Sequence, residues 1–261
     1  MVKVPESSKM GIVLSGGGVR GMAHIGLLKA LGERGIYPHW ISGTSVGALV
    51  GALYAGGRDS GEMMAFFRET PLFRYNFFSL NKPGLLDTDR YFEVFMEYWP
   101  HNSFESLGKP LFVVATDLLA GREAIFHKGP LIPALLASAA LPPIFSPVEM
   151  ESGLYADGGI MNNFPLEPIK EHATFILGSN VSVVKEVGRS DIRSSFQLAN
   201  RTTALMIYAI NRQKIKGCDL VFEPLELEKI GVLDKKGMEK AFQIGYDHSC
   251  RVLDSGGYTS S

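Results

Sequence analysis

The sequence predicts an α/β fold built around a mostly parallel sheet, and two observations support this prediction. The first fifty-five of the 261 residues alternate between short apolar runs and longer segments of small and apolar residues, which is the pattern of two strand–helix units. Two such units in succession are typical of a parallel sheet with helices packed on its faces. Farther along, a continuous apolar run at Leu111–Asp117 is typical of a buried strand.

The expected elements follow in chain order. The first strand is predicted at Met10–Ser15 and the first helix at Val19–Arg34, where Gly35 ends it. The second strand is predicted at 39–42, and a second helix, rich in small residues, at 48–55. Later strands are expected at Leu111–Asp117, Thr174–Asn180 and Leu220–Glu223, and long helices at Ser194–Lys216 and Lys236–Leu253. Because the chain shows no internal repeat, we expect one domain over 1–261, completed by the helices and strand of 181–261.

The composition limits the classes of function. Hydrophobic residues make up 46% of the chain, charged residues 20%, and the net charge is −1, the balance of an ordinary globular protein. Such a charge does not predict nucleic-acid binding. The N-terminus lacks an apolar signal-peptide core, and no run of about eighteen apolar residues is present that could span a membrane. We therefore expect a cytoplasmic protein, with a peripheral membrane location as the alternative, and buried free thiols at Cys218 and Cys250. The sequence does not indicate the oligomeric state.

Aromatic residues are concentrated between Phe66 and Phe104, where twelve of the chain's 27 aromatic residues occupy 39 positions. One interpretation is ordinary core. The other is a mobile cap over 62–108, whose apolar side contacts acyl chains or a membrane surface through 66–104. If the stretch is a cap, truncation of Phe77, Phe78 or Trp99 should weaken hydrolysis of long-chain lipid more than hydrolysis of a short soluble ester. Helical spacing within the stretch links Tyr91, Phe92, Phe95, Tyr98 and Trp99.

The motif Gly-x-Ser-x-Gly occurs at Gly43-Thr44-Ser45-Val46-Gly47. A predicted strand precedes it and a predicted helix follows it, which is the order that a nucleophile elbow requires. The tight turn lifts the Ser45 hydroxyl out of the backbone and sets it at a helix N-terminus, where partial positive charge favours a developing anion. The sequence therefore predicts a nucleophilic serine.

A second glycine motif, Gly16-Gly17-Gly18-Val19-Arg20-Gly21, follows the first predicted strand. It satisfies Gly-x-Gly-x-x-Gly, but a dinucleotide site also needs an acidic residue about twenty positions on, at the end of the second strand. No acidic residue lies between Gly35 and Arg58. The loop could instead offer backbone N–H groups to a carbonyl oxygen that becomes negative during acyl transfer. Arg20 would then point at a carboxylate, at a carbonyl or at a bound anion, or lie on the surface.

Ser45 needs a proton acceptor, and two kinds are available. In the order of an α/β-hydrolase triad, the histidine would be His172 or His248, although neither sits in a turn typical of a site. Asp157 sits in Tyr155-Ala156-Asp157-Gly158-Gly159, which is also a common turn sequence. A carboxylate base, with an ordinary pKa near 3.9, would keep the enzyme active at pH 5.5 unless burial raises that pKa strongly, whereas a histidine with a pKa near 6.5 would not.

Taken together, Gly-Gly-Gly-x-Arg-Gly, Gly-x-Ser-x-Gly and Asp-Gly-Gly, in this order, resemble the motifs of the patatin-like phospholipase family. The segments 115–118 and 137–145 are also similar to that family, and the resemblance covers about residues 10–180. It implies a three-layer α/β/α sandwich that hydrolyses carboxylic esters of lipids through an acyl-enzyme, without a metal or organic cofactor.

The resemblance also assigns roles to residues. Ser45 would be the nucleophile and Asp157 the base of a dyad without histidine. The oxyanion hole would come from Gly16, Gly17 and Gly18, with supporting positions at Arg20, Gly21, Gly43, Gly47, Gly158 and Gly159. Three alternatives stay open: an esterase with a histidine triad, a nucleotide-binding protein, and a non-catalytic binder of lipids or acyl carriers.

Overall fold

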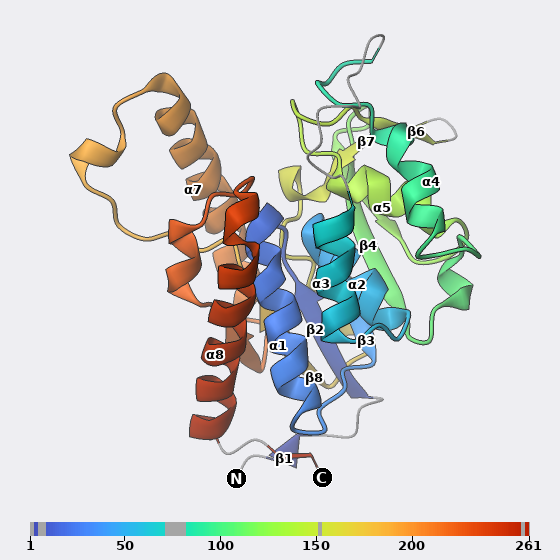
Figure 1. Cartoon of the computed structure of the whole chain (residues 1–261), viewed down its shortest axis with the longest axis vertical. Coiled ribbons are helices and arrows are strands. Elements are labelled where there is room, and N and C mark those ends of the chain that lie inside the picture. The colour runs from blue at the N-terminus through green and yellow to red at the C-terminus, as the bar shows by residue number, and fades with distance from the viewer. Residues whose placement is uncertain (1–2, 5–8, 71–81, 151–152, 257–258, 261) are drawn as a thin grey trace.

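A computed structural model describes residues 3–4, 9–70, 82–150, 153–256 and 259–260 (Figure 1). Its centre is a run of five parallel strands in the spatial order β4–β3–β2–β8–β9. The order is typical of an α/β fold, because successive strand–helix units add neighbouring parallel strands. The bounds are Met10–Leu14 (β2), Trp40–Thr44 (β3), Leu111–Asp117 (β4), Phe175–Ser179 (β8) and Leu220–Phe222 (β9). All five predicted strands are present within two residues of the expected bounds.

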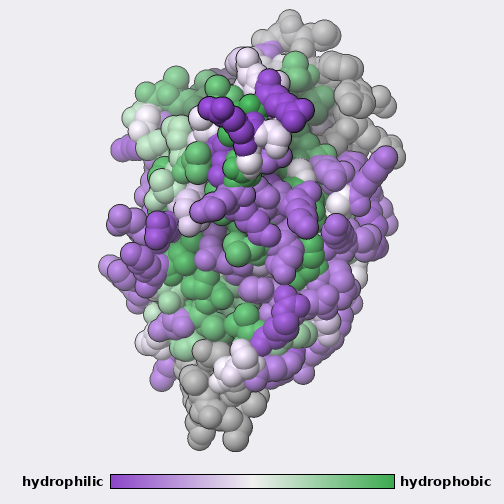
Figure 2. Space-filling model, turned by 90° about the vertical axis from the view of Figure 1, so that its left-hand side faces the viewer, coloured by the Kyte–Doolittle hydropathy of each residue, from purple (hydrophilic) through white to green (hydrophobic). Residues whose placement is uncertain are grey.

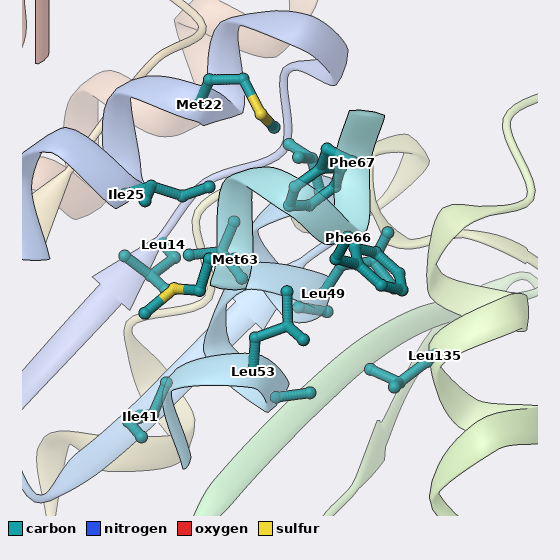
Figure 3. Close-up of a cluster of buried hydrophobic side chains, with 14 of the residues drawn as sticks. Leu14, Met22, Ile25, Ile41, Leu49, Leu53, Met63, Phe66, Phe67 and Leu135 are labelled. Carbon is teal, nitrogen blue, oxygen red and sulfur yellow. The ribbon is translucent and has the colours of Figure 1, made fainter. Parts of the chain in front are cut away.

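Helices cover one face of this sheet, and their buried side chains form the larger core cluster (Figures 1 and 3). The helices are α1 (Met22–Gly32), α2 (Val46–Ala55), α3 (Ser60–Glu69), α5 (Leu131–Ala139) and α8 (Met238–Gly256). In Figure 3, Leu14 of β2 and Ile41 of β3 meet Ile25, Leu49 and Met63 from three different helices. Continuous apolar strands need such cover because each of their faces carries hydrophobic side chains.

The opposite face carries a smaller cluster of buried side chains, which includes Val13, Phe112 and Ile176 from the strands. The short helix α6 (Glu167–Lys170) and the residues around it cover this face, with Phe164 and Ile169 as the largest contributions. The structure is therefore a sheet between two unequal layers, as the predicted α/β/α sandwich requires.

Three strands on the β4 side of the sheet form antiparallel pairs, and no sequence pattern had indicated β5 or β6. They are β5 (Arg122–Phe126), β6 (Val148–Met150) and β7 (Gly153–Asp157). Most side chains of β5 are exposed or half-buried, so the strand has no apolar run to reveal it. The sheet is accordingly mixed rather than wholly parallel. Two further short strands, β1 (Lys3–Val4) and β10 (Thr259–Ser260), pair with each other near the chain ends.

The first predicted helix begins later than expected. Residues Gly18–Gly21 form a 3-10 turn, and α1 starts at Met22. The helix also ends two residues earlier than predicted, at Gly32, and Gly35, with φ 69°, follows in the turn after it. The predicted C-terminal helices are α7 (Ser195–Ile215) and α8, and α8 packs closely on α1. At the crossing, a Cβ on Gly245 would lie 2.3 Å from the carbonyl oxygen of Ala23, so only glycine allows this approach.

The aromatic stretch contributes to the core wherever the structure describes it. Phe66, Phe67, Tyr91, Phe95, Trp99 and Phe104 are all buried. The predicted helical segment is short, with α4 (Phe92–Met96) preceded by a 3-10 turn. The core interpretation therefore holds for these six side chains, and Trp99 is a poor probe of lipid contact. Residues 71–81, which include Phe77 and Phe78, lie outside the described residues.

Two further sequence expectations concern thiols and membrane spans. Cys218 and Cys250 are both free and half-buried. Among the described residues, no helix combines the length and apolarity needed to cross a membrane.

Candidate active site

Ser45 lies in the turn between β3 and α2, with φ 56° and ψ −127°. A positive φ is rare for a residue with a side chain and marks the strained turn of a nucleophile elbow. Its backbone N–H donates to the Ser138 hydroxyl at 2.8 Å, and Ser138 donates to the Val114 carbonyl at 2.6 Å. These bonds attach the elbow to α5 and β4, which compensates for the local strain.

The elbow depends on glycine because α2 begins against the neighbouring strand. A Cβ on Gly47 would lie 2.2 Å from the carbonyl oxygen of Leu14 in β2. A Cβ on Gly43 would lie 2.5 Å from the carbonyl oxygen of Gly47. Both predicted supporting glycines thus allow backbone segments to approach where a side chain would separate them.

Asp157 reaches Ser45 because β3 and β7 share one edge of β4. Val113 and Val114 pair with both β3 and β5, so these two strands lie on opposite edges of β4. Residues Ala115 to Asp117 pair with both β5 and β7, which places β7 on the same edge as β3. Thr44 is opposite Val114, and Asp157 is opposite the next residue, Ala115. The ends of two strands that run in opposite directions therefore meet at the elbow.

The contact between the two predicted residues is direct. The Ser45 hydroxyl donates to Oδ2 of Asp157 at 2.6 Å, across 112 positions of sequence. Oδ1 of Asp157 accepts the Gly159 N–H at 2.7 Å, so each carboxylate oxygen has a defined partner. Asp157 is only 3% exposed. A carboxylate this close to a serine hydroxyl has the geometry of a general base.

Burial changes the acid–base behaviour of this pair. Desolvation raises the pKa of Asp157 to about 6, against the opposing effect of the hydrogen bonds from Ser45 and Gly159. A carboxyl group with this pKa is largely protonated at pH 5.5. Strong burial was the stated exception to the expectation that activity persists at pH 5.5, and this exception applies to Asp157. Acid pH does not distinguish a base of this kind from a histidine.

The glycine loop follows β2, which is the parallel neighbour of β3, and so lies beside the elbow. A Cβ on Gly16 would lie 3.4 Å from the Ser45 Cβ. The Gly16 N–H donates to the Asn163 carbonyl at 3.1 Å. The Gly16 carbonyl accepts from the hydroxyls of Ser182 and Ser15, at 2.8 and 3.0 Å. Among the hydrogen bonds of the described residues, none uses the N–H of Gly17 or Gly18.

Arg20 points at carbonyl groups, which was one of the possibilities that the sequence left open. Its Nε donates to the Ile230 carbonyl at 2.7 Å and an Nη donates to the Glu228 carbonyl at 3.2 Å. Burial lowers the pKa of Arg20, and the nearby charge of Glu228 opposes this effect. The Val19 N–H donates to the Val232 carbonyl at 2.8 Å. The C-terminal part of the chain thus holds the glycine loop from its outer side.

The remaining predicted glycines lie where the loops pack together. A Cβ on Gly21 would meet Val46, the first residue of α2, at 2.4 Å, and one on Gly158 would meet the Val114 carbonyl oxygen at 2.2 Å. A Cβ on Gly159 would lie 2.9 Å from Oδ1 of Asn163, and one on Gly16 would lie 2.3 Å from the same atom. The structure therefore brings every predicted site residue to one region around Ser45.

Sequence reasoning missed the polar residues behind the loops. Asn163 lies between the glycine loop and the Asp-Gly-Gly turn, and its Nδ2 donates to the Ser182 hydroxyl at 3.1 Å. His24 is fully buried below the loop, with Nε2 2.9 Å from the Ser15 carbonyl and Nδ1 2.7 Å from the Ser179 hydroxyl. A carbonyl only accepts, so Nε2 carries the proton. Burial lowers the pKa of His24 to about 4, so it is neutral at physiological pH.

Neither histidine of the alternative triad contributes to this region. His172 stacks on Trp40, at 4.4 Å between ring centroids, and on Phe112, at the covered face of the sheet. His248 lies within α8, where burial and the charge of Arg251 lower its pKa. The Ser45 hydroxyl donates to Asp157, and the backbone N–H of Ser45 donates to Ser138. Among the described residues, no histidine forms a hydrogen bond with Ser45.

Comparison with known proteins identifies the family. The family model described as patatin-like phospholipase matches residues 12–170, which contain most of β2, the glycine loop, the elbow and the Asp-Gly-Gly turn. The chain belongs to the patatin-like phospholipase family. The motif-based resemblance is thereby confirmed, and the matched region contains Ser45, Asp157 and the glycine loop but not the C-terminal segments that hold Arg20.

Relatives of this patatin-like chain are generally longer. It is 36% identical over 170 residues to an uncharacterized NTE family protein of Mycobacterium bovis, covering 64% of this chain and 47% of the relative. It is 30% identical over 194 residues to lysophospholipase NTE1 of Cryptococcus neoformans, covering 70% of this chain and 11% of that protein. The chain thus spans about half or less of the length of these relatives.

The similarity in fold to a solved structure covers nearly all of the chain. The crystal structure of VipD from Legionella pneumophila superposes with a TM-score of 0.56 at 16% sequence identity, covering 97% of this chain and 68% of VipD. At this identity, the similarity concerns the fold alone. It confirms the predicted α/β architecture, including the part beyond residue 170.

Proposed function

We propose that this chain hydrolyses carboxylic esters of lipids, with Ser45 as the nucleophile and Asp157 as its base. The observation that carries the proposal is the 2.6 Å hydrogen bond from the Ser45 hydroxyl to the buried Asp157 carboxylate. The lipid class of the substrate is supported by membership of the family and by the relative named lysophospholipase NTE1.

The reaction begins with transfer of the Ser45 proton to Oδ2 of Asp157 as Oγ attacks the carbonyl carbon of the ester. The tetrahedral intermediate collapses when the C–O bond to the alcohol breaks and Asp157 returns its proton to the leaving alkoxide oxygen. Water then gives a proton to Asp157 and attacks the acyl-enzyme. The fatty acid leaves, and the proton returns to Ser45.

The negative charge that develops on the carbonyl oxygen needs donors that are already in place. Ser182 and Ser15 hold the Gly16 carbonyl, and Ser182 follows β8, on the side of β2 away from β3. In a trans peptide the following N–H points opposite to the carbonyl, so the Gly17 N–H faces the side of β3 and Ser45. Gly16 donates to Asn163, which leaves Gly17 and Gly18 as the oxyanion donors of the proposed hole.

The pKa of Asp157 sets the pH at which the base is available. Because the carboxylate form accepts the proton, we expect kcat/KM to fall as the pH drops below about 6. Raising the local pKa from its usual value also makes Asp157 a stronger base, which compensates for the absence of imidazole from the proposed dyad.

A fluorophosphonate probe tests the nucleophile. We expect the probe to label the wild-type protein at Ser45 alone, because the elbow geometry and the base activate only this serine. Intact mass and peptide mapping locate the label, with Ser45→Ala as the blank and the exposed Ser255→Ala as the matched control. Undiminished labelling of Ser45→Ala would exclude Ser45 as the nucleophile.

Substitution of the two distant histidines tests the triad alternative. His172→Gln and His248→Gln should each change kcat/KM on a soluble ester by less than tenfold, or about 1.4 kcal/mol of barrier. Both side chains lie outside the site, so only indirect effects are expected. A loss of a thousandfold in either variant, with circular dichroism unchanged, would restore a histidine base.

A further inference from the structure

The helix α7 has an exposed hydrophobic surface that the active site does not explain. Its N-terminal part extends away from the sheet in Figure 1, whereas Asn211 near its C-terminal end is buried. Four of its large apolar side chains are strongly exposed. Their exposed fractions are 52% for Leu198, 42% for Leu205, 68% for Met206 and 42% for Ile210. Leu205, Met206 and Ile210 follow Leu198 by seven, eight and twelve residues, which places all four on one side of the helix. We name these four residues the α7 apolar face.

The charges around this face are mostly positive. Helix α7 contains Arg201, Arg212 and Lys214 and no acidic residue. Over 185–216 there are seven basic and two acidic residues, a net charge of +5, although the whole chain carries −1. Lys214 pairs with Glu167 at 2.7 Å, whereas Arg189, Arg193 and Arg212 have exposed side chains. Figure 2 shows this side of the molecule, with hydrophobic and strongly hydrophilic side chains interspersed in its upper part.

The same region adjoins the glycine loop. A cavity of about 270 Å³ is lined by Arg20 of the loop, by Val187 and Ile192 before α7, and by Arg201 within it. Arg201 also donates to the Lys185 carbonyl at 2.7 Å, which attaches α7 to the preceding segment. The segment 185–194 thus connects the exposed helix with the side of the site that Arg20 holds.

We propose that α7, with the segment 185–194 before it, docks the protein on an anionic lipid bilayer. An exposed apolar helix face beside exposed cations is the pattern of a helix that lies in the membrane interface. Apolar side chains enter the boundary between head groups and acyl chains, and each Lys or Arg gains from the negative surface potential. The proposal goes beyond the chemistry of Ser45, and its benefit for catalysis depends on the proposed lipid substrate.

The charge pattern favours a lipid surface over a second copy of this chain. A two-fold dimer through α7 would bring identical cationic surfaces together, with few acidic partners between them. A bilayer containing acidic lipids supplies both the apolar phase and the negative charge. This surface differs from the aromatic stretch that the sequence offered as one possible lipid-binding surface, where six of the described aromatic side chains are buried.

Vesicle flotation with the Ser45→Ala protein tests the proposal without consuming the lipid. We expect flotation with vesicles that contain phosphatidylglycerol, much weaker flotation with phosphatidylcholine alone, and loss of binding at high salt. Replacing Leu205 and Met206 by serine should weaken binding about tenfold or more. The triple change of Arg189, Arg193 and Arg212 to glutamine should have an effect of at least that size.

Matched variants control for exposure and net charge. Tyr37→Ser removes an exposed apolar side chain elsewhere, and the triple change of Arg58, Arg68 and Arg122 to glutamine removes the same charge from other surfaces. Both should float like the parent. The proposal would be overturned if the α7 variants floated as well as the parent, or if the parent did not float. It would also be overturned by a salt-resistant dimer that the α7 variants abolish. Hydrolysis of a short soluble ester by the active protein is measured separately, so failure of docking and failure of the proposed hydrolase remain distinguishable.

Discussion

Asp157→Asn should remove nearly all hydrolysis and, at the same time, stabilise the folded protein at neutral pH. The activity should fall by about a thousandfold or more, because an amide cannot accept the Ser45 proton. The shape of the site is retained: the asparagine oxygen can accept the Gly159 N–H, and its amide nitrogen can donate to the Ser45 hydroxyl.

The gain in stability follows from the sign of the pKa shift. The folded protein raises the pKa of Asp157 from 3.8 to about 6, so between these values it binds the proton more tightly than the unfolded chain does. Stability therefore falls as the pH rises through this interval. Above pH 6 the buried charge costs about 3 kcal/mol, from about 1.4 kcal/mol for each pH unit. Asparagine removes this cost.

Denaturant unfolding at several pH values measures the effect. We expect the free energy of unfolding of Asp157→Asn to exceed that of wild type by about 1–3 kcal/mol at pH 8, and the difference to shrink toward pH 4. Ser45→Ala is the matched inactive control, because it keeps the buried carboxylate and removes one of its donors. It should not be stabilised. Equal stability of wild type and Asp157→Asn at pH 8 would contradict the predicted pKa effect, and near-normal activity would remove Asp157 from the mechanism.

Gly18→Ala should lower kcat by about a hundredfold to a thousandfold, the usual cost of losing an oxyanion donor. Gly18 has φ 57°, and a Cβ there would lie 2.2 Å from the carbonyl oxygen of Val232. The same carbonyl accepts the Val19 N–H, so the added methyl group must displace either the loop or the segment that holds it. Either shift moves the donors of Gly17 and Gly18 away from the ester.

Gly121→Ala separates this steric effect from backbone strain. Gly121 has φ 62°, nearly the same as Gly18, but a Cβ there would meet nothing within 4 Å. It lies in the turn between β4 and β5, beyond the site. We expect Gly121→Ala to lose about 1 kcal/mol of stability and no catalytic rate. If both variants have the same kcat, the glycine loop does not contribute to the oxyanion hole.

The candidate site could be predicted from the sequence because its motifs are local. Ser45 requires glycines at fixed offsets, and the strand and helix that frame the elbow are contiguous with it. The acidic residue was found through its Asp-Gly-Gly context, although the residues alone left His172 and His248 as alternatives. The family motifs, rather than periodicity, decided between these possibilities.

Other features depend on residues far apart in the sequence. The strand β5 has little apolar periodicity, and β7 meets the elbow only because β4 pairs with β3 and β7 along one edge. The contacts of Arg20 with carbonyls near position 230 cross more than two hundred residues. Asn163, Ser182 and His24 have no motif of their own, since their roles come from the backbone groups they reach.

The parallel strands, the elbow around Ser45, the glycine loop and the family could all be predicted from the sequence, because each depends on residues that are neighbours along the chain. The electrostatics of the site and the character of the surface depend on the tertiary structure. Desolvation of Asp157 is a property of everything packed around it, and it changed the expected pH behaviour. Whether an apolar side chain lies in the core, as Trp99 does, or faces solvent, as Met206 does, depends on what packs against its helix.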